Sequence, residues 1–172
     1  YHIDVDEIEN KINHNTKAIL FVDLYGQTPE IDKLKKIATK HNLFLIEDAA
    51  QSTGAEYKNH RVGNLVDLTC FSFHPVKNLG SIGDAGAVTG NKNLVDRVKM
   101  YRDHGRKTKY DYETVGYNAR IDCLQAAVLL EKINIYLEWN QKKRSIANIY
   151  NQELQTVIPI TRPDCLHSYY VY

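Results

Sequence analysis

The sequence has no long apolar run and no excess of charge of either sign. No stretch approaches the roughly 20 apolar residues that a membrane-spanning helix needs, and the start YHIDVDEIEN lacks the basic and apolar regions of a signal peptide. The 22 Lys and Arg residues against 21 Asp and Glu residues give a formal net charge of +1, so nothing indicates a nucleic acid or an anionic membrane as a partner. We therefore expect a cytoplasmic protein whose ligands bind at a local site.

Cysteine is also scarce. Cys70, Cys123 and Cys165 are odd in number, far apart and without CxxC spacing, which favours buried reduced thiols over a disulfide or a zinc site. We expect no metal ion. The sequence lacks an initiating Met and stops in HSYYVY (167–172), an alternating aromatic run typical of the middle of a strand. We therefore expect the chain to be the central part of a longer protein.

What the sequence does contain is typical of a globular α/β domain. The 172 residues are 43% hydrophobic and 25% charged, enough for one ordinary domain with a core. Apolar runs at 18–24 and 43–49 predict buried strands, and 29–41 predicts a helix between them, with Pro29 in its first turn. Strands without polar alternation, joined by a crossover helix, indicate a parallel sheet covered on both faces.

The second half continues this alternation. It predicts strands at 69–73 and 85–90, a helix from an Asn cap to Gly105 at 91–105, a polar Tyr-rich loop at 106–117 and a long helix from residue 121. One face of the last helix carries Ile121, Leu124, Val128, Ile133 and Leu137. We expect this helix to bend or break near Asn140, because a helix reaching Leu154 would be unusually long.

Acidic residues and one lysine gather where the predicted strands end. Ligands of open parallel sheets bind outside the carboxyl ends of the strands, and Asp23, Glu47 and Asp48 lie at such ends, followed by a turn with His74 and Lys77. Each residue alone also fits a solvated strand end or an exposed turn. A magnesium-dependent NTPase is disfavoured, because the phosphate-binding pattern GxxxxGK[ST] is absent.

Five motifs taken together are more specific than any single residue. They are EDAAQS (47–52), FSFHPVKNLG (71–80), GDAGAV (83–88), RDHG (102–105) and GYNARIDCLQAA (116–127). Their order and spacing resemble the sugar aminotransferases of the DegT/DnrJ/StrS family, fold-type I enzymes that use pyridoxal 5′-phosphate (PLP). The resemblance extends over nearly the whole chain.

The resemblance implies a fold and a domain division. The fold is α/β, a three-layer, mostly parallel sheet with flanking helices that forms the large domain of PLP-dependent transferases. Residues 1–135 would be part of that domain, whose N-terminal portion is missing here. Residues 136–172 would be a linking helix and the start of a small C-terminal α/β domain.

The resemblance also assigns two catalytic roles. Lys77 would bind PLP as a Schiff base, since burial disfavours the ammonium form of a lysine and leaves a nucleophilic amine. Once released, the same amine would carry the proton between donor and cofactor. Asp48 would hold the ring nitrogen of PLP protonated through a charge-assisted hydrogen bond.

Three further residues match cofactor-binding positions of the family. Gln51 would lie beside the 3′-oxygen of PLP, Ser72 would donate its hydroxyl to the phosphate, and Asn118 would reach the phosphate of a partner subunit, which implies a homodimer with a shared active site. Other interpretations stay open for all three. Gln51 could satisfy backbone groups at a helix start, Ser72 could be a buried strand serine, and Asn118 could cap the helix that follows it.

Other positions are less decided by the resemblance. His74 and His104 are candidates for substrate contacts, although His104 could equally be a helix-terminal residue favoured by the dipole. Arg120 fits an interface better than catalysis. Asp23 stands where many relatives carry His, and Tyr170 replaces the second His of an HxYHxY motif, which weakens inferences about both positions.

The implied function is the transfer of an amino group from an amino acid, usually glutamate, to a keto group of a nucleotide-linked sugar, for surface glycans or glycosylated metabolites. The segment KNLGSIGDAGAV (77–88) is closer to members that act on 3-keto than on 4-keto sugars. One alternative is a catalytically silent regulatory or binding subunit, which the joint presence of Lys77, Asp48 and Gln51 disfavours. The other is a related PLP-dependent deoxysugar dehydratase, which carries His in place of this lysine.

Overall fold

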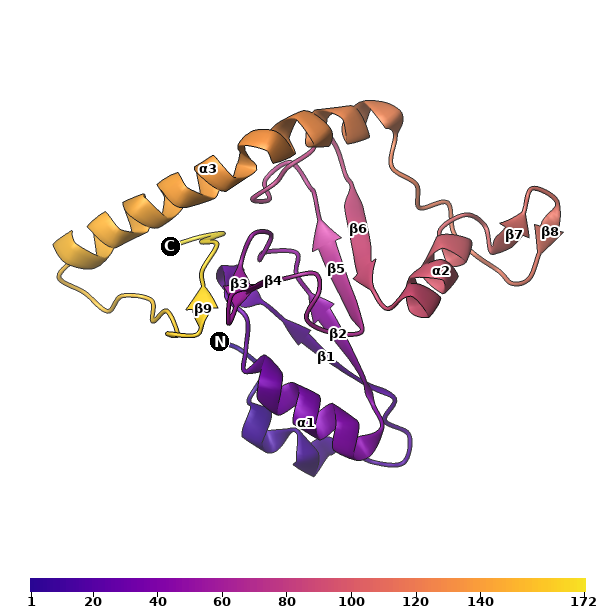
Figure 1. Cartoon of the computed structure of the whole chain (residues 1–172), viewed down its shortest axis with the longest axis horizontal. Helices are drawn as coiled ribbons and strands as arrows, with labels where there is room; N and C mark the ends of the chain where they lie inside the picture. The colour runs from indigo at the N-terminus through magenta and orange to yellow at the C-terminus, as the bar shows by residue number, and fades with distance from the viewer.

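A four-stranded sheet lies at the centre of the computed structural model, which describes all residues, 1–172. Its strand order is β1-β2-β5-β6, with β1 (Ala18–Val22), β2 (Phe44–Asp48), β5 (Leu68–Ser72) and β6 (Gly86–Gly90). The first three strands are parallel, and β6 runs antiparallel to β5 (Figure 1). The predicted α/β class with a mostly parallel sheet is confirmed.

Helix α1 (Ile31–His41) connects β1 to β2 and packs on one face of the sheet. Its residues Ile31 and Leu34 are fully buried in the same core as Phe21. The helix begins two residues after Pro29, because Pro29 and Glu30 lie outside the helical backbone. On the opposite face Leu20 and Phe44 are 60% and 52% exposed. The apolar runs predicted a sheet covered on both faces, but within this chain only one face of these strands is covered.

Helix α2 (Lys92–Tyr101) begins where the sequence predicted. The side chain of Asn91 accepts a hydrogen bond from the backbone N–H of Asn93 at 3.0 Å, as an N-cap residue does. The helix ends at Tyr101, before Gly105. The segment expected to be an irregular loop instead forms the hairpin of β7 (Arg106–Thr108) and β8 (Asp111–Tyr112), which extends from one end of the molecule (Figure 1).

Helix α3 (Cys123–Glu153) is continuous over 31 residues, so of the expected bend or break near Asn140 the break is wrong. No Gly or Pro interrupts the segment, and these are the usual causes of a kink. Asp122 caps the helix in a reciprocal capping box with Gln125. The predicted domain boundary after residue 135 falls inside this helix and stays a prediction.

The face of α3 that packs on the rest of the chain is also not the predicted one. Leu124, Ile133 and Leu137 are more than half exposed. The buried residues are Leu129, Tyr136, Asn140 and Ala147. Figure 1 shows α3 crossing the end of the sheet toward which β5 points, so this mixed apolar and polar stripe faces the turns that follow the strands.

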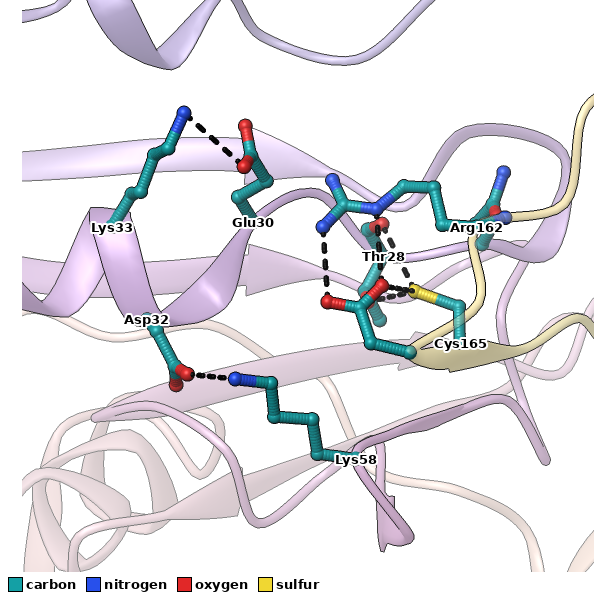
Figure 2. Close-up of polar contacts among 9 residues, drawn as sticks. Thr28, Glu30, Asp32, Lys33, Lys58, Arg162 and Cys165 are labelled. Carbon is teal, nitrogen blue, oxygen red and sulfur yellow. Dashed lines mark hydrogen bonds and ion pairs between the residues drawn. The ribbon is translucent and has the colours of Figure 1, made fainter.

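The C-terminal segment returns to the first half of the chain through a small sheet. Its order is β4-β3-β9, with β3 (Glu56–Tyr57), β4 (His60–Arg61) and β9 (Cys165–Leu166). Cys165 Sγ lies 3.4 Å from Thr28 Oγ1, and Arg162 pairs with Asp164 beside it (Figure 2). These contacts fix residues 167–170 next to the large sheet.

Three short 3₁₀ helices complete the structure, η1 (Val5–Glu7), η2 (Glu9–Lys11) and η3 (Leu24–Gly26). All three cysteines are free, but only Cys70 and Cys165 are partly buried, and Cys123 is exposed, contrary to the expectation for buried thiols. It lies at the first position of α3, outside the packed stripe. None of the helices combines the length and the hydropathy of a bilayer-spanning segment.

Candidate active site

Asp48 and Ser72 lie together at the carboxyl end of the sheet. They are the last residues of the parallel strands β2 and β5, and Asp48 pairs with Cys70, two residues before Ser72. Both line an open cavity of about 210 Å³ whose other walls include Leu20 and Ala50. Asp48 Oδ1 accepts a hydrogen bond from the Ala50 N–H at 3.0 Å, which fixes the carboxylate at the mouth of the strand.

Gln51 is held at the same edge by Tyr25. The backbone N–H of Tyr25 donates to Gln51 Oε1 at 2.7 Å, while Gln51 Nε2 makes no hydrogen bond within the chain. Tyr25 has a φ of 63°, a left-handed conformation that costs a non-glycine residue about 1–2 kcal/mol. Such strain persists only where surrounding contacts hold it, and here it aims the Tyr25 N–H at Gln51.

Lys77 follows β5 in a tight turn, as predicted. Its backbone N–H donates to the His74 carbonyl at 2.8 Å, and its side chain is partly buried, with Nζ 4.7 Å from the centre of the Tyr170 ring. A side chain at Gly80 would place Cβ within 2.3 Å of the Pro75 carbonyl oxygen, so the turn can close only on glycine. The turn thus presents one ammonium group beside an aromatic ring.

The C-terminal segment joins Gln51 to the Lys77 turn. Ser168 Oγ donates to the Gln51 carbonyl at 3.4 Å, and the Ser168 carbonyl accepts from Asn78 Nδ2 at 3.2 Å. The Tyr170 N–H donates to the Tyr25 carbonyl at 2.9 Å. The sequence alone did not indicate Ser168 or Tyr25. Ser168 contacts Asn78, which is 90 positions away, and Gly26, which is 142 positions away, and no local pattern predicts such contacts.

Helix α3 supports the same turn from its buried stripe. Lys143 Nζ donates to Asn78 Oδ1 at 2.7 Å, and Lys132 Nζ donates to the Gly80 carbonyl at 2.5 Å. Burial lowers the pKa of Lys143. Burial also raises the pKa of Tyr136 to about 12, so that its hydroxyl remains a donor to the Thr53 carbonyl.

His104 and Asn118 lie apart from this cluster, whereas His74 belongs to the Lys77 turn through its backbone carbonyl. The His74 side chain is exposed, and its Nε2 lies 3.7 Å from Asp84 Oδ1. The His104 N–H donates to the Tyr117 carbonyl at 2.9 Å, and Asn118 is exposed, its Oδ1 accepting from Arg120 Nε at 3.2 Å. No hydrogen bond or ion pair connects His104 or Asn118 to the residues around Lys77.

Comparison with known proteins identifies the family of the chain. The sequence profile of the DegT/DnrJ/EryC1/StrS aminotransferase family matches residues 1–168. The chain is 44% identical over 163 residues to the erythromycin biosynthesis sensory transduction protein EryC1 of Saccharopolyspora erythraea, covering 94% of this chain and 44% of the relative. It is 41% identical over 162 residues to the dTDP-3-amino-3,4,6-trideoxy-alpha-D-glucose transaminase of Streptomyces venezuelae, covering 91% of this chain and 43% of that enzyme.

A solved structure shares the fold. The crystal structure of S. venezuelae DesV in complex with a ketimine intermediate superposes with a TM-score of 0.93 at 38% identity, over 98% of this chain and 47% of that chain. The present chain thus spans slightly less than half the length of the relatives it matches. The family profile, the identities and the fold agree, and the chain belongs to the DegT/DnrJ/EryC1/StrS aminotransferase family.

Proposed function

We propose that the full-length protein transfers an amino group from an amino acid to a nucleotide-linked keto sugar with the help of PLP. The observation that carries the proposal is that Asp48 and Ser72 line an open cavity at one edge of the sheet, where Ser168 also links Gln51 to the turn of Lys77. Membership of an aminotransferase family supports the reaction type.

The residues at this edge fit PLP by their chemistry. A carboxylate suits a protonated ring nitrogen, a hydroxyl at the end of the neighbouring strand suits a phosphate oxygen, and a lysine amine suits the aldehyde. Asp48 and Ser72 line the cavity directly, and Gln51 retains a free amide Nε2. We therefore assign Asp48, Gln51, Ser72 and Lys77 as cofactor-binding residues.

The bound cofactor would supply an electron sink for the carbanion formed at the amino acid. Lys77 would hold the cofactor through its amine and, when that amine is free, would accept and return the proton of the amino acid. The Asp48 carboxylate would accept a hydrogen bond from the ring N–H and keep that proton in place. Tyr25, Ser168 and Tyr170 orient Gln51 and Lys77 through their hydrogen bonds and the aromatic contact.

For the substrates we propose glutamate as donor and a 3-keto sugar nucleotide as acceptor. The S. venezuelae relative is named as a transaminase of a dTDP-linked 3-amino sugar. This name supports a 3-keto rather than a 4-keto sugar as the acceptor. His74 and His104 are candidates for sugar contacts because both are exposed. Asn118 is exposed and lies outside the cluster. This position supports a homodimer in which Asn118 contacts the phosphate of the PLP bound to the partner subunit.

A second candidate is a regulatory subunit that keeps the fold. The relative from S. erythraea carries the name of a sensory transduction protein, and this name motivates the alternative. The set of Asp48, Gln51 and Lys77 opposes it, because a protein without transamination has no chemical need for a ring-nitrogen acid and an imine lysine together.

The test uses the full-length protein and its Lys77→Ala variant. We expect the wild type to be yellow with PLP, to bleach with glutamate and to aminate a 3-keto sugar nucleotide, whereas Lys77→Ala folds but has no activity, because the covalent anchor is lost. Lys107→Ala, a change of an exposed hairpin lysine, is the matched control and should behave as wild type. Borohydride reduction and peptide mapping should place the cofactor on Lys77, and a label on another lysine would refute the assignment.

A further inference from the structure

A second group of carboxyl residues lies on the opposite face of the sheet from Asp48. Asp23 follows β1, Glu47 precedes Asp48 in β2, and both side chains are fully buried. Glu47 pairs with Phe21 across the two strands, and alternation along a strand puts Phe21 and Asp23 on one face. Asp23 and Glu47 are therefore diagonal neighbours inside the core.

Each carboxyl group has one oxygen that is bonded and one that is not. Ser52 Oγ donates to Asp23 Oδ2 and Thr69 Oγ1 donates to Glu47 Oε2, both at 2.7 Å, and both hydroxyl residues are fully buried. No donor of the chain has hydrogen-bonding geometry toward Asp23 Oδ1 or Glu47 Oε1. Ionising both of two neighbouring buried carboxyl groups is unfavourable, whereas one proton between them would provide a donor where the chain offers none.

The electrostatic environment assigns that proton. Burial raises the pKa of Asp23 well above its ordinary value, and the charge of Glu47 raises it further. Burial also raises the pKa of Glu47, but the hydrogen bond from Thr69 and the one that a protonated Asp23 would donate oppose the effect. The pair thus titrates as a unit, with the proton on Asp23 and donated to Glu47.

The pair is connected to Asp48 through the backbone. The Asp23 N–H donates to the Asp48 carbonyl at 3.1 Å, and Glu47 is the residue directly before Asp48. A change in the charge or geometry of the pair therefore acts on the strand end from which the Asp48 carboxylate projects.

We propose that Asp23 and Glu47 share one proton and serve as a positioning pair for Asp48, with Asp23 as donor and Glu47 as acceptor. The shared proton leaves the pair with one negative charge instead of two. That remaining charge adds to the negative potential at the position where Asp48 would contact a cationic ring nitrogen; this role rests on the proposed function.

The groups around the pair do not offer another source of neutralisation. The backbone N–H of Gly63 and the charge of Lys35 on α1 lower the pKa of Glu47, but they do not outweigh its burial, and the Asp48 carboxylate raises the pKa of Asp23. The chain contains no group of three or more His, Cys, Asp or Glu side chains arranged to hold a metal ion. A proton is the remaining counter-charge for two carboxylates at this depth.

The first test measures the proton itself in the full-length protein without cofactor. Carbon-13 NMR of the side-chain carboxyls, assigned with Asp23→Asn and Glu47→Gln, should show one protonated group in the pair at pH 7. Both resonances at the ionised position would overturn the proposal. Because this measurement requires no cofactor and no turnover, it can succeed or fail independently of the proposed function.

The second test uses stability against pH. An acid whose pKa is raised by folding binds its proton more tightly in the folded state, so wild-type stability falls as pH rises from the ordinary carboxyl range through the raised value. Asn at position 23 supplies an N–H to Glu47 at every pH, so Asp23→Asn should lack this decline and equal or exceed wild type at alkaline pH. An Asp23→Asn protein with the same decline as wild type would contradict the shared proton.

The third test separates positioning from folding. Asp23→Asn keeps one negative charge on Glu47, so it should bind PLP within about twofold of wild type. Asp23→Asn/Glu47→Gln removes that charge and should bind PLP about tenfold more weakly, a change in free energy that corresponds to one pKa unit. The pH at which the visible absorbance of the lysine-bound cofactor changes should shift in the double variant only. If it shifts equally in the single and double variants, the residual charge has no positioning role.

Discussion

At the scale of single residues, the site depends on contacts that fix side chains from the backbone. The Ala50 N–H orients the Asp48 carboxylate, and the Tyr25 N–H orients the Gln51 amide. Both side chains therefore have a fixed orientation before any ligand binds. Lys77 is positioned differently, by a turn that closes on Gly80 and by the ring of Tyr170. The Lys77 amine therefore keeps side-chain freedom, which it would need in the proposed roles of anchor and proton carrier.

Asp48→Asn tests this at the residue scale. Asn retains an oxygen that can accept from the Ala50 N–H, so we expect normal folding and retained PLP binding. The negative charge at the ring nitrogen is lost, so the activation free energy of amino transfer should rise by about 3 kcal/mol. A change of this size is typical when one preorganised electrostatic contact is removed. Single-turnover rates with glutamate measure this, with Asp111→Asn on the exposed hairpin as control; an unchanged rate would exclude Asp48 from this role.

At the scale of elements, the sequence predicted what local patterns determine. The apolar runs of β1 and β2 and the Asn91 cap of α2 are local signals, and the strands and the helix start lie where they indicate. The continuity of α3 follows from the absence of Gly and Pro between residues 123 and 153, a local signal that the expected break overlooked. Its packed stripe was not predictable, because it depends on long-range contacts. Tyr136 reaches Thr53, 83 positions away, so a partly polar stripe is buried while the more apolar face stays exposed.

Tyr136→Phe tests the docking of α3. The change removes the hydroxyl that donates to the Thr53 carbonyl, and a buried carbonyl left without a donor costs about 1–3 kcal/mol. We expect the free energy of unfolding to fall by that amount in denaturant titrations. Tyr110→Phe, at a residue that is 82% exposed, should leave stability unchanged; equal stability of both variants would show that the hydroxyl does not anchor the helix.

His167 makes the C-terminal segment sensitive to acid. Burial lowers the pKa of His167 from 6.5 to about 4, and its Nδ1 accepts from the Tyr169 N–H at 2.8 Å, which requires an unprotonated nitrogen. The unfolded chain binds the proton first, so stability is full above pH 6.5 and falls by up to about 3 kcal/mol as pH drops toward 4.

Thermal unfolding between pH 4 and 7 measures this effect. His167→Gln should show a flatter pH dependence, because the amide does not titrate, whereas His60→Gln at an exposed strand residue should follow wild type. If His167→Gln retained the full slope, the acid sensitivity would belong to other groups, of which the partly buried His2, whose pKa burial also lowers, is the first to examine.

At the scale of the whole molecule, apolar surface is left open on two sides. Leu20 and Phe44 are exposed on one face of the sheet, and β1 is an edge strand. On α3, Leu130 and Ile133 are 67% and 54% exposed. Exposed apolar faces and unpaired strand edges favour association, and the cavity lined by Asp48 and Ser72, the proposed cofactor site, opens on the same face as Leu20.

The 172-residue chain produced by itself should therefore associate and bind PLP weakly. Its open cavity lacks cover on the Leu20 side, and Asn118 lies away from the Lys77 cluster, so a single copy cannot assemble all the assigned cofactor contacts. Sedimentation velocity should show association that increases with concentration, and Leu20→Lys with Phe44→Lys should shift it toward monomer, while Lys107→Ala should not. A monomeric, yellow chain that aminates a keto sugar nucleotide would show instead that this half of the family fold is a complete catalytic unit.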